Sequence, residues 1–352
     1  MAGRESAERI ALPLKVGVTG AMIVAGLGAS FAPFMLAAAV KQTGINEAAA
    51  ANLISSEFLA FLIMALIVMR TPKHDPRVLG VTSCLGYALG GLFAATAKSI
   101  EALYVARIVC GLAGGMLMAV TMRIIASHFT YVRLFAIAIV GNAIFSAVLL
   151  FAVPATLQMS GPAAAYLTLS CVALVFAPAM VSLKLGHRVE LLGKAPILLP
   201  GVILLFAYFL SRLNDSVAWQ FTERLGMIAG MDEMTVGAVL SAATCIALLG
   251  PIAAIKLEKR VHAAYVLLGF LAFKAFQSLI ICYVPHPIAF GVAQVSAMFA
   301  YVLLSQLFMT SFAMADASGR MAVIGGIMGM IADAAGPFTG GQSGLGKFGQ
   351  VL

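Results

Sequence analysis

The sequence predicts an all-α protein that crosses a membrane many times, and three observations support this fold class. Hydrophobic residues make up 62% of the 352 residues, and charged residues only 10%, whereas a soluble domain carries about 25% charged residues. The mean hydropathy is +1.03, and the apolar residues fall in long uninterrupted runs. Because most residues of a globular protein still face water, we expect the surface of this chain to face lipid.

The apolar runs are long enough to cross a bilayer as helices. A transmembrane helix needs about 20 residues, whereas a barrel strand needs only about 10 alternating ones. Backbone N–H and C=O groups in lipid must also find hydrogen-bond partners within their own segment, and a helix provides these partners. The expected spans are 16–40, 48–69, 78–97, 102–126, 134–157, 163–183, 197–219, 235–255, 263–284, 288–313 and 321–340.

The basic residues orient these spans. The run 16–40 exceeds the roughly 7–15 apolar residues of a signal peptide, so we expect it to be the first transmembrane helix. With the N-terminus in the cytoplasm, fifteen of the 22 Lys and Arg residues lie on the cytoplasmic side and four on the opposite side. The positive-inside rule therefore predicts a multi-pass protein of the cell inner membrane with a cytoplasmic N-terminus.

Several classes of function are excluded by what the chain lacks. The net charge of +8 is scattered over short loops, so it does not predict nucleic-acid binding. No ATP-binding loop of the form G-x-x-x-x-G-K-[ST] occurs. The histidines and cysteines do not cluster, and we expect neither a metal site nor a cofactor.

The longest polar connection, 184–196, divides the chain into six spans and five. We therefore expect an N-terminal bundle at 1–183, a cytoplasmic loop at 184–196 and a C-terminal bundle at 197–352. In both halves a basic loop follows the second span, and internal repeats of this kind are typical of secondary transporters.

Local motifs give the chain a resemblance to the major facilitator superfamily. The fourth span has an Arg followed by small residues, and the stretch Trp219–Gly237 resembles the outer loop between helices seven and eight of bacterial efflux-type members. The loop after the second span is basic and contains one acid, as in the family, but it lacks the family's glycines. The residues that carry the motifs are Arg107, Gly111, Gly114, Gly115, Asp75, Arg77, Asp316, Gly319, Arg320, Gly336 and Pro337.

The resemblance implies a two-bundle fold with about eleven transmembrane helices, similar to an efflux-type member without the twelfth helix. Only residues 341–352 follow span eleven, and they are too few and too polar to cross the membrane. Alternating access by a monomer is implied, with the proton as coupling ion and a small-molecule substrate. Helices one, four, seven and ten would line the substrate cavity.

Ionisable residues inside the spans are the candidate functional residues, because each costs about 2.5–3.5 kcal/mol at the bilayer centre. Glu57 and Arg107 lie at depths of roughly 13 and 8 Å, which lets two long side chains meet. The pair is either sensitive to protons during transport or a static ion pair, and the sequence leaves both possibilities open.

The C-terminal half contains four more such residues. Arg212 and Asp215 lie three residues apart near the outer end of span seven, where they can pair locally or snorkel to the headgroups. Lys274 falls in span nine, which is peripheral in the family, so we expect it to pair with a neighbouring helix or to snorkel. Asp333 lies deep in span eleven, where desolvation would let it titrate.

The substrate is expected to be neutral or anionic. Span one has no charged residue, and span ten offers the hydrogen-bonding groups of Gln294, Tyr301 and Gln306. We expect a secondary active transporter, with proton-coupled efflux as the favoured function and a proton-coupled uptake symporter as the alternative. A transporter-derived structural or receptor protein without transport is the alternative from another class. An enzyme is not expected, because the buried acids of spans two, seven and eleven share no repeated motif.

Overall fold

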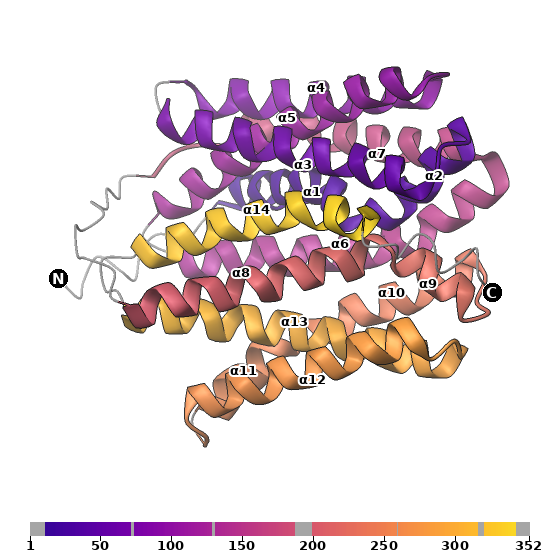
Figure 1. Cartoon of the computed structure of the whole chain (residues 1–352). Helices are drawn as coiled ribbons and strands as arrows, with labels where there is room; N and C mark the ends of the chain where they lie inside the picture. The colour runs from indigo at the N-terminus through magenta and orange to yellow at the C-terminus, as the bar shows by residue number, and fades with distance from the viewer. Residues whose placement is uncertain are drawn as a thin grey trace. The chain divides into compact units, whose positions relative to one another are not determined.

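The computed structural model describes residues 11–71, 74–128, 131–186, 199–258, 260–315 and 320–342, and all regular structure within these ranges is helical (Figure 1). Eleven helices in this part of the chain are long and apolar enough to cross a membrane. The all-helical fold class and the expected number of spans are therefore confirmed.

The chain forms two compact units. The first contains residues 1–45, 56–146 and 159–190, and the second contains 46–55, 147–158 and 191–352. The boundary expected at 184–196 falls mostly on residues 187–198, outside the described part of the chain, and stays a prediction. The same holds for the tail expected to follow span eleven, since residues 343–352 are not described.

The described residues of the first half form seven α-helices and a short 3-10 helix. They are α1 (Leu12–Ser30), α2 (Ala32–Thr43), α3 (Glu47–Arg70), α4 (Pro76–Thr96), α5 (Ile100–Ala126), α6 (Tyr131–Ser160), α7 (Pro162–Phe176) and η1 (Ala177–Ser182). The span expected at 16–40 is thus two helices. The break falls at Phe31 (φ −108°, ψ 9°), because Pro33 has no N–H to continue the helical hydrogen bonds.

Capping residues fix where two of these helices begin. Asp75 precedes α4, and its carboxylate accepts a hydrogen bond from the backbone N–H of Arg77 at 2.9 Å. Ser99 precedes α5 in the same way and accepts from the N–H of Ala102. Side-chain oxygens at this position satisfy N–H groups that have no partner inside the helix.

Glycines bring α4 close to its neighbours α5 and α7 (Figure 1). A side chain at Gly90 would meet the carbonyl of Ala106 on α5, and one at Gly91 would crowd the carbonyl of Tyr166 on α7. Small residues allow this approach, which packs helices in lipid without a hydrophobic driving force.

The second half of the chain supplies α8 (Leu199–Gln220), α9 (Thr222–Ile228), α10 (Glu233–Ala247), α11 (Gly250–Glu258), α12 (Ala263–Tyr283), α13 (Pro287–Ala315) and α14 (Arg320–Gln342). Helix α8 packs on α14, and α13 packs on α10, α11 and α12. Two expectations need correction here. The span expected at 235–255 is interrupted after α10, just before Pro251, and the stretch expected as an outer loop contains α9.

Apolar side chains also cover the outside of the helices. Leu59, Ile63 and Ile67 are 51%, 47% and 49% exposed on α3, and their spacing of four places them in one stripe. Such a stripe is unfavourable in water and suits a lipid surface, as the composition predicts.

Candidate functional site

A buried ion pair joins α3 and α5 in the first unit. The guanidinium of Arg107 donates to a carboxylate oxygen of Glu57, and the two side chains are 1% and 3% exposed. The two residues meet as the depth argument expected. Charges buried this completely are stable only when paired, because each alone loses its hydration without compensation.

The fourth-span glycines explain how Arg107 reaches its partner. Gly111 lies one turn after Arg107, and a side chain there would overlap the backbone carbonyl of Glu57. One further turn along, a side chain at Gly115 would overlap the carbonyl of Phe61. The missing side chains therefore let α5 approach the backbone of α3, and this proximity brings the ion pair together.

Other elements of the first unit complete the surroundings of the pair. Gly28 on α1 faces the carboxylate of Glu57, where any side chain would collide with it. Tyr87 and Tyr166 are both buried beside this ion pair. The sequence analysis did not select these tyrosines, although a tyrosine in the middle of an apolar run is a signal, since its hydroxyl needs a partner.

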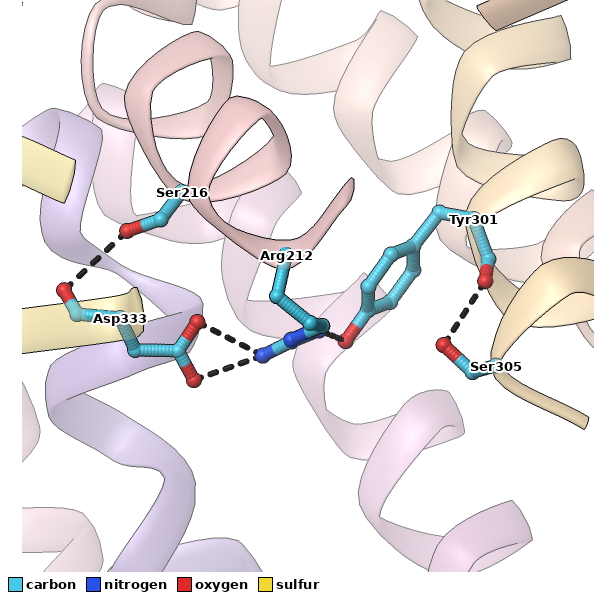
Figure 2. A network of polar contacts seen from close by, with 5 residues as sticks. All are labelled: Arg212, Ser216, Tyr301, Ser305 and Asp333. Atoms are coloured by element: carbon cyan, nitrogen blue, oxygen red, sulfur yellow. Dashed lines mark hydrogen bonds and ion pairs between the residues drawn. The ribbon is translucent and has the colours of Figure 1, made fainter. Parts of the chain in front are cut away.

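A second polar cluster lies within the second unit (Figure 2). Arg212 on α8 donates from Nη2 to both carboxylate oxygens of Asp333 on α14, at 2.7 and 2.6 Å. Arg212 also donates to the hydroxyl of Tyr301 on α13. Ser216, one turn further along α8, donates to the backbone carbonyl of Asp333 at 3.1 Å. The arginine on α8 is thus tied to α13 and α14, two helices far from it in the sequence.

The local pairing of Arg212 with Asp215 that their spacing allowed does not form in the structure. Asp215 instead forms an ion pair with Lys274 on α12. Residues three apart on a helix differ by about 60° in direction, so Arg212 reaches α14 while Asp215 reaches α12. The expectation that Lys274 pairs with a neighbouring helix is confirmed.

Tyr301 connects the two ion pairs. The Arg212 guanidinium carbon lies 4.9 Å from the centroid of the Tyr301 ring, and Lys274 Nζ lies 5.4 Å from the same centroid. Both distances are within the range of cation–π attraction. Two cations, two carboxylates and one phenol therefore form one electrostatic unit with no net charge.

The remaining predicted residues take no part in these ion pairs or are not described. Gln294 is buried on α13, and Gln306 lies on the same helix. Gly336 and Pro337 are inside α14, where a side chain at Gly336 would overlap Ser216. Gly319 lies outside the described residues, and the side chain of Arg320 is not described. The described residues contain no group of His, Cys, Asp and Glu fit to hold a metal.

Eleven membrane-length helices in the described part of the chain, with ion pairs buried between them, define a multi-pass membrane protein. The chain belongs to the Major Facilitator Superfamily, whose sequence pattern matches residues 18–338. It is therefore a secondary transporter of small molecules and not an enzyme. No functionally curated protein matches the chain.

Solved transporter structures share the fold at low sequence identity. A bacterial homologue of the human lysosomal transporter Spinster, inward-facing and occupied, is 13% identical with a TM-score of 0.74, over 97% of this chain and 82% of that one. A nucleoside transporter is 13% identical with a TM-score of 0.72, over 96% and 91%. A D-xylose–proton symporter is 12% identical with a TM-score of 0.71, over 93% and 89%. At these identities the similarity establishes the fold alone.

Proposed function

We propose that the protein couples the movement of a small neutral or anionic organic solute across the cell inner membrane to the movement of protons. The buried Glu57–Arg107 pair supports this proposal most directly. A carboxylate that is stable only beside its cation is a natural proton acceptor, because it is protonated whenever the cation moves away.

Export is the direction that the resemblance to efflux-type members favours, with the N-terminus on the cytoplasmic side. Proton-driven export requires that proton and substrate bind in turn. Proton-coupled uptake is the second candidate, and the Arg212–Asp333 pair favours it. If Arg212 turns from Asp333 to a substrate anion, the carboxylate left behind takes a proton, and proton and anion then move together.

Transport by the purified protein in proteoliposomes tests the proposal. An imposed proton gradient should drive accumulation of at least one member of a panel of neutral and anionic metabolites. Glu57→Gln should abolish this accumulation and leave exchange of substrate largely intact, because exchange requires only that the loaded carrier reorients. The amide retains an oxygen acceptor for Arg107, so the variant preserves the contact while losing the titratable group.

Two controls make the result decisive. Glu101→Gln changes an exposed glutamate at the start of α5 and should accumulate substrate at the wild-type rate. Accumulation by Glu57→Gln at that same rate would show that the acid is only structural. A protein that binds metabolites but neither accumulates nor exchanges any of them would instead be a receptor.

A further inference from the structure

The cluster around Tyr301 contains more hydrogen-bond donors than its own carboxylates use. Arg212 makes both bonds to Asp333 through Nη2, and its buried Nε has no hydrogen-bond partner among the described residues. A guanidinium offers five donors in a planar fork that matches a carboxylate. Arg212 therefore binds Asp333 with only one of its three nitrogens.

The two ion pairs differ in how firmly they are enclosed. The side chains of Lys274 and Asp215 are 7% and 14% exposed. Asp333 is 30% exposed, the largest value of the four charged groups, while its partner Arg212 is 15% exposed. Separating a carboxylate from its cation costs less free energy when water can partly hydrate the carboxylate. Asp333 is therefore the carboxylate whose ion pair is easiest to break.

From this geometry we infer that the cluster is a carboxylate-binding site, in which the carboxylate of an organic substrate replaces Asp333 on Arg212. The inference rests on the second candidate of the proposed function, in which proton and substrate move together, and specifies the substrate class as a small monocarboxylate. The hydroxyl of Tyr301, which already contacts Arg212, is placed to assist. In the resting state Asp333 occupies the position of the substrate's carboxylate.

Charge balance explains why one carboxylate is accepted and a second is not. The Lys274–Asp215 pair is neutral by itself and remains in place, so only the charge of Arg212 is free to bind an anion. The displaced Asp333 then takes up a proton, because it has lost the charge of Arg212 while most of its side chain remains shielded from water. Among the described residues, Asp333 faces Arg212 and Tyr208 on α8. Arg212 in turn contacts Tyr301 on α13, and the ring of Tyr301 lies beside Lys274 of the Asp215–Lys274 pair.

Binding can be followed in the purified wild-type protein through Trp219, the only tryptophan, which lies two turns after Arg212 on α8. The probes are carboxylates and their primary amides, lactate with lactamide and benzoate with benzamide, alongside inorganic phosphate and sulfate. We expect saturable binding of a carboxylate, no binding of its amide, and uptake of about one proton per anion in weakly buffered solution. Equal binding of amide and acid, or tighter binding of phosphate or sulfate, would overturn the inference.

Two substitutions should act in opposite directions. Arg212→Lys retains the charge and loses the fork, so carboxylate affinity should fall about tenfold or more. Asp333→Asn removes the competing carboxylate, so affinity should rise and proton uptake should disappear. A purely structural ion pair would predict loss of affinity in both variants, and that result would refute the proposal. Arg70→Lys, at the exposed end of α3, is the matched control.

The inference and the proposed function fail in different ways. Accumulation of a neutral solute with no carboxylate binding leaves proton-coupled transport standing and rejects the carboxylate site. The other outcome is carboxylate binding, with opposite responses of Arg212→Lys and Asp333→Asn, but no transport in proteoliposomes. That result supports the carboxylate site and rejects proton-coupled transport. If Arg212→Lys does not fold, the rise in affinity and the lost proton uptake of Asp333→Asn remain the deciding measurements.

Discussion

The energetic coupling between Glu57 and Arg107 can be predicted from their burial. With side chains only 3% and 1% exposed, neither charge is accessible to solvent if its partner is removed. Replacing one member of such a pair costs about 3–5 kcal/mol, because the other is left unpaired. We therefore expect Glu57→Met and Arg107→Met each to lower the free energy of unfolding by about this amount.

The double variant should behave differently from the sum of the single ones. With both charges gone, two methionines fill an apolar space, and replacing a buried ion pair in this way is often neutral or stabilising. The double variant should be nearly as stable as the wild type, which corresponds to a coupling energy of about 5 kcal/mol or more. That energy changes the folded-to-unfolded ratio by more than about a thousandfold.

Equilibrium unfolding of the purified protein in mixed micelles, titrated with a denaturing detergent, measures these values. Arg70→Met combined with Glu57→Met is the control cycle, and its effects should add, because Arg70 is exposed at the far end of α3. If Glu57→Met and Arg107→Met also add to within about 0.5 kcal/mol, the two charges do not stabilise one another and the argument from burial is wrong.

Two further predictions concern helix packing and orientation. Gly111→Ala should lower the free energy of unfolding by about 1–3 kcal/mol in the same assay, because the new Cβ would overlap the carbonyl of Glu57. Gly269→Ala on α12 is the control, since a Cβ there has open space. Equal stability of the two variants would contradict the close approach of α5 to α3. In a protein without its native cysteines, Ser160→Cys should react with an impermeant maleimide in intact cells, because the end of α6 is predicted to face the outside. His74→Cys should react only after permeabilisation, because its loop is predicted to be cytoplasmic. The opposite pattern would invert the topology.

The sequence by itself determined the class of the fold. Apolar run length and the shortage of charge predict membrane helices, because lipid requires each spanning segment to satisfy its own backbone. Both signals are local, and the structure confirms the number of candidate spans. The breaks at Phe31 and before Pro251 were missed, although the prolines that cause them are visible in the sequence. Their effect depends on where the neighbouring residues end each helix, which hydropathy does not report.

Depth and spacing also predicted that Glu57 and Arg107 could meet, because spans two and four, which are α3 and α5 in the structure, carry their charges at depths that two long side chains can bridge. They did not predict the partners of Arg212 and Asp215. Sequence spacing favoured a local pair, but side chains three residues apart point about 60° from one another. Which helix lies in each direction is decided by packing, and here α14 presents Asp333 while α12 presents Lys274. Only the tertiary structure could bring four charges from three helices to a single tyrosine on a fourth, because nothing local in the sequence specifies which faces of distant helices come together.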